Sequence, residues 1–316
     1  MAMTCFKSYD IRGRVGVDLD EGIARRIGRA FAEVMHPGRV VLGRDIRDSS
    51  PALQAAIAEG LAEAGVDVID IGLCGTEEVY FATDHLGAGG GMMVTASHNP
   101  KGDNGVKLIG PGARPISRAS GLGAMEALVE MGNFGPAAAS PGRIEAADPR
   151  AAYVTRALSF VEPADIRPLK VLVNAGNGAA GPTFDAVAEA LVAAGAPVTF
   201  ARMHHTPDET FPHGIPNPLL PENQPVTAEA VRAEGADLGV AWDGDFDRCF
   251  FFDETGAFIE GEYVVGLLAA AMLARAPGAR IVHDPRVIWN TQEIVAREGG
   301  EAVASRTGHA LIKEKM

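Results

Sequence analysis

Short apolar runs along the chain alternate with loops rich in glycine, asparagine or aspartate and with amphipathic stretches that end at glycine. Val40–Leu42 is predicted to be a strand. A helix is predicted to begin at Ser50-Pro51, a serine cap followed by a first-turn proline, and to end at Gly65 before a strand over residues 66–71. This order of strand, helix and strand predicts an α/β protein with parallel strands.

Two loops with chemical potential follow predicted strands. The run Gly-Gly-Gly-Met-Met-Val94 is predicted to be a buried strand, and it leads into residues 95–105, a loop without helical periodicity that contains Ser97. Residues 238–242 are predicted to be a second strand, which delivers Asp243–Arg248 in the same way. Ligands of open α/β sheets bind at the carboxyl ends of strands, so both loops are candidate sites.

The rest of the pattern predicts further α/β units. Residues 132–148, rich in Gly, Pro and Ala, are predicted to connect two domains, and residues 204–225, with six prolines, to be an irregular excursion. The third unit would leave a sheet edge and an apolar face uncovered, so we expect a C-terminally truncated chain. Strands are predicted at 170–173, 197–200, 280–283 and 301–304, a hairpin at 250–259, and helices at 182–194, 263–274 and from Gly308 onward.

Composition narrows the possible partners. The 316 residues include 28 Lys plus Arg against 41 Asp plus Glu, and a net charge of −13 disfavours nucleic acid as a partner. Three widely spaced cysteines support neither a disulfide framework nor a zinc site. The N-terminus has no apolar signal core, and the longest apolar run, 264–274, is shorter than the ~18 residues that span a membrane. We expect a cytoplasmic protein without a membrane partner; the sequence leaves the oligomeric state open.

The triplet Asp243, Asp245 and Asp247 is the first candidate for metal chemistry. Three alternating carboxylates can gather hard oxygen ligands around one divalent cation, which relieves their mutual repulsion. A solvated acidic turn is the plainer alternative. A calcium loop of the EF-hand type is disfavoured because its sixth position, normally glycine, is Arg248 and because strands are predicted on both sides.

Two further motifs have more than one interpretation. Ser97, followed by His98, is a possible nucleophile, although isolated serines in polar loops more often cap or turn the chain, and no hydrolase-type Gly-x-Ser-x-Gly elbow surrounds it. The run Gly176-x-Gly178-x-x-Gly181 resembles a dinucleotide fingerprint, but Arg202 stands near the place of the expected acidic residue. An NADP-dependent oxidoreductase and close helix-to-strand packing therefore remain alternatives.

Taken together, the serine and aspartate loops resemble the α-D-phosphohexomutase superfamily. The matching motifs are Tyr9-Asp-Ile-Arg-Gly13, Thr95-Ala-Ser-His-Asn-Pro100, Asn104-Gly-Val-Lys-Leu108 and Asp243-Gly-Asp-Phe-Asp-Arg248. The likeness runs over essentially the whole chain and is greatest to the bacterial phosphomannomutase branch that feeds GDP-mannose synthesis. The stretches that resemble this branch in particular include Gly75–Phe81, Gly214–Pro221 and His283–Arg286.

This resemblance implies a mechanism and a cofactor. Ser97 would be a phosphoserine, and its phosphate with Asp243, Asp245 and Asp247 would hold Mg²⁺. The enzyme would interconvert mannose 6-phosphate and mannose 1-phosphate through a hexose 1,6-bisphosphate, which also serves as activator. Such an intramolecular phosphotransferase, an isomerase, relies mostly on positioning and charge stabilisation.

The resemblance also implies roles for other side chains. Lys107 would exchange the hydroxyl proton, for which its pKa would have to be lowered, while Arg12, His98 and Arg248 would stabilise the transferring phosphoryl group. The residues implied to contact the phosphosugar are Tyr9, Arg12, Arg286 and His309.

The domain division expected from this resemblance is 1–148 with the phosphoserine loop, 149–255 with the metal loop, and 256–316 as a partial third domain. The family's sugar-discriminating Gly-Glu-x-Ser loop and its fourth domain would lie beyond Met316, so we expect weak mutase activity. Glucose or glucosamine phosphates remain alternative substrates. An NADP-dependent oxidoreductase and an inactive binding module remain alternatives of other classes.

Overall fold

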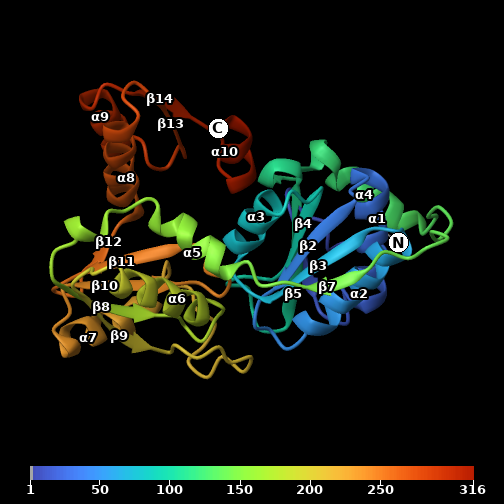
Figure 1. Ribbon diagram of the computed structural model, residues 1–316, viewed down its shortest axis with the longest axis horizontal. Helices are drawn as coiled ribbons and strands as arrows, with labels where there is room; N and C mark the ends of the chain where they lie inside the picture. The colour runs from blue at the N-terminus through green and yellow to red at the C-terminus, as the bar shows by residue number, and fades with distance from the viewer. Residues whose placement is uncertain (1–2) are drawn as a thin grey trace.

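Three α/β units follow one another along the chain (Figure 1). The structure, a computed structural model, describes residues 3–316, with only the backbone described at 309 and 310. The first unit lies on the right of Figure 1, the second on the left and the third above the second. Helix α10 (His309–Lys315) returns from the third unit to lie beside α3 (Thr76–His85) of the first.

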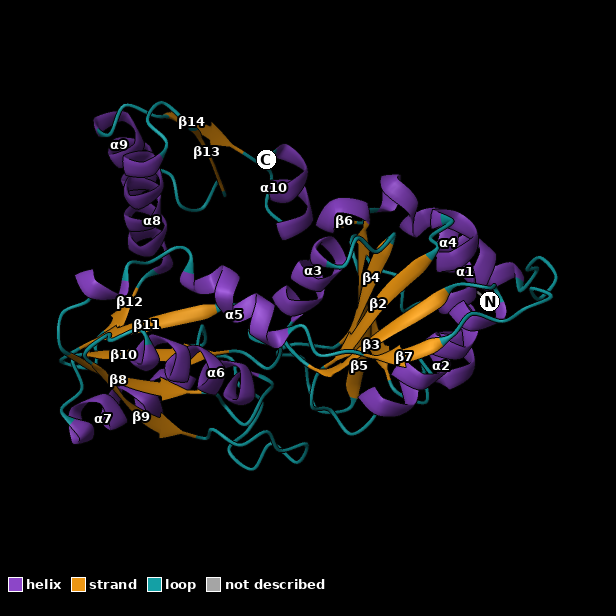
Figure 2. Cartoon of the chain, viewed as in Figure 1, coloured by secondary structure: helices purple, strands orange, loops and turns teal. Residues whose placement is uncertain are grey.

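The first unit is built on a mixed sheet with strand order β1-β5-β4-β2-β3-β7, to which β6 adds beside β5 (Figure 2). Strands β4, β2, β3 and β7 run parallel, whereas β5 and β1 are antiparallel to their neighbours. The strands are β1 (Ile11–Arg14), β2 (Arg39–Arg44), β3 (Asp67–Leu73), β4 (Gly90–Val94), β5 (Asp103–Gly110), β6 (Arg114–Pro115) and β7 (Ile144–Ala146).

Both faces of this sheet are covered because its central strands are apolar on both sides. Met92 of β4 packs into the core formed with α1 (Glu21–Met35), α2 (Ser50–Glu63) and α4 (Gly123–Met131). Met93 points to the opposite face, into the cluster that contains Val79 of α3. The alternating pleat of the strand therefore fixes β4, and the loop that follows it, between two layers of helices.

The second unit has the strand order β12-β11-β10-β8-β9, in which β10, β8 and β9 are parallel. The antiparallel pair β11–β12 confirms the predicted hairpin. The strands are β8 (Leu169–Asn174), β9 (Val198–Met203), β10 (Leu238–Trp242), β11 (Cys249–Asp253) and β12 (Phe258–Ile259), and the helices are α5 (Arg150–Leu158), α6 (Ala180–Ala193) and α7 (Gln224–Glu234).

The third unit contains a parallel pair of strands, as predicted, between α8, α9 and α10. Its small core includes Ala269, Leu273 and Val295, while Leu267 and Leu268 on the outer side of α8 are exposed. No helix among the described residues is long and apolar enough to cross a membrane. The new elements are α8 (Gly261–Arg275), β13 (Arg280–His283), α9 (Trp289–Arg297) and β14 (Glu301–Ala304).

Two predictions of irregular chain were wrong in part. Within the expected connector 132–148, residues 144–146 form β7 and extend the first sheet beside β3. All three side chains are exposed, so no apolar periodicity marks the strand. Pro225, expected at the end of the excursion, lies in the first turn of α7, where its missing N–H costs nothing.

A buried polar contact joins the first and second units. The carboxylate of Glu78 on α3 accepts hydrogen bonds from the backbone N–H of Gly75 at 2.7 Å and from the hydroxyl of Thr183 on α6 at 3.0 Å. Arg150 of α5 lies 3.5 Å from the same carboxylate and donates to the carbonyl of Leu73 at 3.1 Å. This contact fixes the N-terminal end of α3 against helices α5 and α6 of the second unit.

Candidate active site

The serine loop of the first unit and the aspartate loop of the second unit meet. Ser97 follows β4, and its Oγ donates a hydrogen bond of 2.5 Å to Oδ2 of Asp243, which follows β10. Nδ1 of His98 lies 3.0 Å from the same Oγ. The structure therefore brings together two strand ends that are 146 residues apart in the sequence.

The backbone of both loops is specialised for this close approach. Ser97 has a φ of 51°, in the left-handed region that non-glycine residues rarely occupy. A Cβ atom on Gly244 would lie 2.6 Å from the carbonyl oxygen of Ser97. Glycine at 244 is therefore required for the two loops to touch.

The three aspartates converge as the sequence predicted, and oxygens of all three carboxylates lie within 4.8 Å of one another. The hydroxyls of Thr76 and Thr95 donate to Oδ2 of Asp245 at 2.7 and 3.1 Å. The other oxygen, Oδ1 of Asp245, is buried and has no hydrogen-bond partner in the described part of the chain. Buried polar atoms normally have hydrogen-bond partners, and an unpartnered carboxylate oxygen is typical of a position that binds a cation.

Charge in this cluster is only partly balanced by the protein. Burial and the neighbouring carboxylate of Asp245 raise the pKa of Asp243. For Asp245, burial alone would raise the pKa, but the ammonium group of Lys107 and the two threonine hydroxyls hold it below its usual range. Asp243 is therefore costly to ionise, whereas Asp245 is stabilised as the anion by its partners. A bound cation would stabilise the ionised form of Asp243.

Lys107, on β5, is held by two members of the triplet. Its Nζ lies 2.7 Å from Oδ2 of Asp245 and 2.6 Å from Oδ2 of Asp247. Burial lowers the pKa of Lys107, but the two carboxylates outweigh this effect and raise it above the ordinary lysine value. The expected lowering of this pKa is therefore not found in the protein alone, because both ion pairs favour the charged form.

Arg12 and Arg248 also border these loops. The Arg248 side-chain Nε lies 3.7 Å from Asp243 and 3.8 Å from Asp247. Arg12, on β1, donates to Oδ1 of Asn99 at 2.5 Å and pairs with Asp10 at 2.9 Å. The guanidinium group of Arg12 therefore lies beside the serine loop, and that of Arg248 lies beside the aspartate carboxylates.

Tyr9 and Arg286 form a separate group where the first and third units face each other. Arg286 pairs with Asp284 at 2.8 Å, and this carboxylate raises the pKa of Arg286. Tyr9 lies close enough to add to the same rise. The ring of Tyr9 also lies beside Gly308, since a Cβ there would come within 3.8 Å of it. The predicted contact residue His309 has a side chain outside the described residues.

Two alternative interpretations from the sequence do not fit this geometry. A Cβ on Gly178 would lie 2.6 Å from the carbonyl oxygen of Gly244, and one on Gly181 would lie 2.1 Å from that of His205. These glycines therefore permit close packing rather than a dinucleotide site, and Arg202 is paired with Asp185 at 2.8 Å. Strands β10 and β11 flank the aspartate loop, which excludes an EF-hand.

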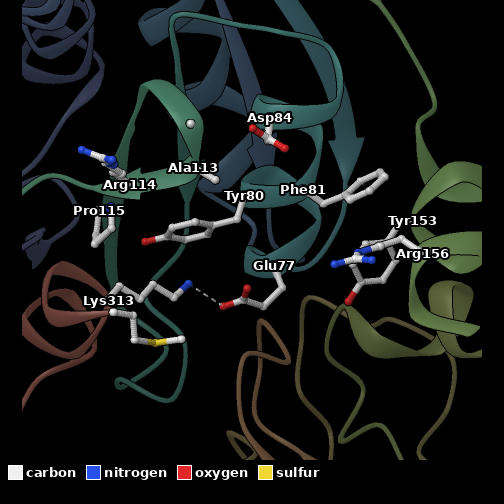
Figure 3. Close-up of a pocket in the computed structure, with 12 residues that line it drawn as sticks. Glu77, Tyr80, Phe81, Asp84, Ala113, Arg114, Pro115, Tyr153, Arg156 and Lys313 are labelled. Carbon is white, nitrogen blue, oxygen red and sulfur yellow. Dashed lines mark hydrogen bonds and ion pairs between the residues drawn. The ribbon is translucent and has the colours of Figure 1, made fainter. Parts of the chain in front are cut away.

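A cavity of about 640 Å³ lies where α3, α5 and α10 converge (Figure 3). Lys313 of α10 reaches across it, with its Nζ 3.2 Å from Glu77 and 3.6 Å from the centre of the Tyr80 ring. The charges of Lys107 and Asp247 act on the pKa of Tyr80, which burial raises. The cavity is bordered by all three units, since its lining includes Tyr80 of the first, Tyr153 of the second and Lys313 of the third.

Comparison with known sequences identifies this arrangement. Models of the phosphoglucomutase/phosphomannomutase α/β/α domains I, II and III match residues 3–130, 151–256 and 260–316. The chain belongs to the phosphoglucomutase/phosphomannomutase family. Its members are phosphohexomutases, so the resemblance seen in the sequence motifs is confirmed.

Individual relatives agree with this assignment. A phosphomannomutase of Salmonella montevideo is 56% identical over 99% of this chain and 69% of its own length, and one from Escherichia coli K12 is 54% identical over the same shares. The crystal structure of a family protein from Burkholderia thailandensis superimposes with a TM-score of 0.89 at 34% identity, covering 100% of this chain and 69% of that one. The mixed α/β fold class predicted from the sequence is thus the fold of this family.

Several residues of the site were not predicted from the sequence. Thr76 stands at the start of α3, and its backbone N–H donates to the carbonyl of Asp245 at 3.1 Å in addition to the hydroxyl contact. Arg47, in the turn before α2, donates to carbonyls of the serine loop. Thr76 lies in a stretch that matches the family, but no local pattern distinguishes either side chain from an ordinary surface residue.

Proposed function

We propose that this protein is a phosphomannomutase that interconverts mannose 6-phosphate and mannose 1-phosphate through a phosphoserine at Ser97. The observation that carries the proposal is the 2.5 Å contact between Ser97 Oγ and Asp243 within a cluster of three carboxylates. An unmodified serine is neutral and requires no cation, whereas a phosphoserine is strongly negative and is stabilised by a cation bound to the neighbouring carboxylates. The relatives named phosphomannomutase, at 54–57% identity, support the choice of reaction and sugar.

The metal that fits the site is Mg²⁺. Asp243, Asp245 and Asp247 offer only hard oxygen donors, and Oδ1 of Asp245 is buried without a described partner. When bound, the cation would supply charge neutralisation for the phosphoserine and the transferring phosphoryl group. In the protein alone, Lys107 neutralises part of the negative charge through its ion pairs with Asp245 and Asp247.

The chemical step needs positioning more than covalent assistance. When Ser97 takes a phosphoryl group from a hexose 1,6-bisphosphate, the new Oγ–P bond forms as the sugar O–P bond breaks. The serine hydroxyl loses its proton, and the sugar oxygen that leaves takes up one proton to become a hydroxyl. In the described part of the chain, the acceptors within 3.0 Å of the Ser97 Oγ are Asp243 Oδ2 and His98 Nδ1. We assign charge stabilisation to Arg12, Arg248 and Lys107, since all three cations border the reacting loops.

The sugar phosphate would bind between the first and third units. Tyr9 and Arg286 lie close together there, Arg12 borders the serine loop, and a guanidinium group is well suited to bind a phosphate. His309 is proposed as a fourth contact by the sequence motif alone. Residues 1–148, 149–255 and 256–316 are the domains that we propose to carry the serine, the metal and the sugar contacts respectively.

The test is phosphorylation of Ser97. The protein is incubated with mannose 1,6-bisphosphate and Mg²⁺, and intact mass and peptide mapping follow the added phosphate. We expect one phosphate on Ser97, none in Ser97→Ala, and none without a divalent cation. An unmodified Ser97 would contradict the proposal, and conversion of mannose 1-phosphate in a coupled assay would separately establish turnover.

A further inference from the structure

A buried arginine lies directly beneath the serine loop. Arg47 follows β2 in the turn that precedes α2, and only 1% of its surface is exposed. Its Nη2 donates to the carbonyl oxygens of Ser97 at 3.0 Å and Asn99 at 2.6 Å. Its Nη1 donates to those of Pro100 at 2.9 Å and Asp103 at 3.0 Å. Nη1 also lies 3.4 Å from the carbonyl oxygen of Lys101, so one guanidinium group gathers five carbonyls between residues 97 and 103.

Burying a charged group without pairing is costly, so this position needs compensation. Asp45 supplies it: its carboxylate is also buried, lies 3.5 Å from Arg47 Nε, and accepts hydrogen bonds from the Arg47 backbone N–H and the Ser50 hydroxyl. The ring of Phe211, from the long excursion of the second unit, lies 5.8 Å from the guanidinium carbon. The arginine is therefore held from both units while its donors serve the serine loop.

The carbonyl of Ser97 is the link between Arg47 and the reacting oxygen. Ser97 occupies a left-handed conformation, which persists only where the surroundings impose it. Its carbonyl oxygen receives the Arg47 hydrogen bond and lies against Gly244, while its N–H donates to the Thr95 hydroxyl at 2.8 Å. With both ends of the residue fixed, its Cβ–Oγ bond is directed at Asp243.

We propose that Arg47 is a positioning residue for phosphoryl transfer, which holds the serine loop in the conformation that directs Ser97 Oγ at the aspartate cluster. The inference rests on the proposed function of Ser97. Among the described residues, Arg47 makes no hydrogen bond or ion pair with the Ser97 hydroxyl or with the carboxylates of Asp243, Asp245 and Asp247, and all its hydrogen bonds to the serine loop are to backbone carbonyls. Lysine at this position would keep the charge but lose the planar fork that spans several carbonyls.

The experiment measures the rate at which Ser97 is phosphorylated at increasing concentrations of a hexose 1,6-bisphosphate with saturating Mg²⁺. The variants are Arg47→Lys and Arg47→Met, and the control is Arg44→Lys. The Arg44 guanidinium donates to the Asp45 carbonyl at 3.3 Å, not to the serine loop. Since misplacement by about 1 Å can cost ~100-fold in rate, we expect maximal rates roughly 10-fold lower in Arg47→Lys and roughly 100-fold lower in Arg47→Met.

Three readouts separate positioning from a merely structural role. The half-saturating concentration and the Mg²⁺ affinity are expected to stay within about twofold of the unmodified protein, because Arg47 binds neither. Hydrogen exchange is expected to accelerate in residues 95–103 and not in β2 or α2. Circular dichroism gives the folded fraction, so that rates refer to folded protein even if Arg47→Met folds poorly.

Each outcome decides the matter. Phosphorylation of Arg47→Lys as fast as that of Arg44→Lys refutes the inference while leaving the proposed function intact. A slower rate with unchanged exchange in residues 95–103, or an effect confined to half-saturation, also refutes it. If Ser97 of the unmodified protein takes no phosphate at all, the proposed function itself fails, and the inference fails with it.

Discussion

Thr183→Val tests the buried contact that fixes the first unit against the second. The hydroxyl of Thr183 donates to the Glu78 carboxylate at 3.0 Å and accepts from Nε of Arg150 at 3.1 Å. Both Thr183 and Glu78 are 2% exposed, so water cannot replace the lost donor. Valine has nearly the same shape, and the substitution therefore removes the hydrogen bonds without creating a large cavity.

The size of the effect follows from the charge on Glu78. Hydrogen bonds to charged groups contribute about 1.5–3 kcal/mol, and a buried group left without its partner loses that amount. Glu78 keeps its contacts with the Gly75 N–H and with Arg150, so we expect the free energy of unfolding to fall by about 2 kcal/mol. For a cooperative unit of this size, that corresponds to a melting temperature lower by roughly 4–8 °C.

The measurement is thermal unfolding followed by circular dichroism at several pH values. Burial raises the pKa of Glu78, with the Gly75 N–H, Arg150 and Thr183 opposing the rise. A raised folded-state pKa stabilises the protein below the ordinary glutamate pKa, and this stabilisation is lost as the pH rises through the folded-state value. Removing the Thr183 donor raises that pKa further, so the gap between variant and unmodified protein is expected to widen with pH across this range.

The control is Thr155→Val, since Thr155 is exposed and its hydroxyl bonds only to the preceding helical turn. Its melting temperature is expected to change by less than about 2 °C, as surface substitutions shift stability by no more than ±0.5 kcal/mol. The reasoning is refuted if Thr183→Val melts like the control, or if its destabilisation shrinks as the pH rises.

Three further substitutions probe the site itself. Lys107→Met removes a cation that lies 2.7 and 2.6 Å from Asp245 and Asp247, so Mg²⁺ affinity in calorimetry is expected to rise roughly tenfold; weaker binding would contradict this reasoning. Asp245→Asn removes a ligand charge and is expected to weaken Mg²⁺ by at least about tenfold, and equal affinity would exclude Asp245 as a ligand. Gly244→Ala places a Cβ 2.6 Å from the Ser97 carbonyl and is expected to slow Ser97 phosphorylation roughly tenfold or more. The matched Gly102→Ala meets nothing within 4 Å, so an equal effect in both would remove the steric explanation.

Local pattern was sufficient for much of the fold. Strands β2 and β10 and helix α2 were predicted because apolar periodicity, a serine cap and glycine stops are properties of neighbouring residues. Strand β7 was missed because its three residues are exposed and show no apolar periodicity. It forms by pairing with the edge of β3, and the local sequence does not reveal this pairing. The start of β5 at Asp103, inside the predicted loop, has the same cause, since its partners β1 and β4 supply the pairing.

The sequence by itself determined which side chains are candidates for the chemistry. It placed Ser97 and the aspartate triplet at the ends of strands, because strand ends follow from short-range periodicity. Only the tertiary structure decided that these two loops touch, that Thr76 bonds to Asp245, that Lys107 is charged between two carboxylates, and that Arg47 lies beneath Ser97. These contacts join residues 50 to 169 positions apart, and such pairings depend on how packed layers meet rather than on any local preference.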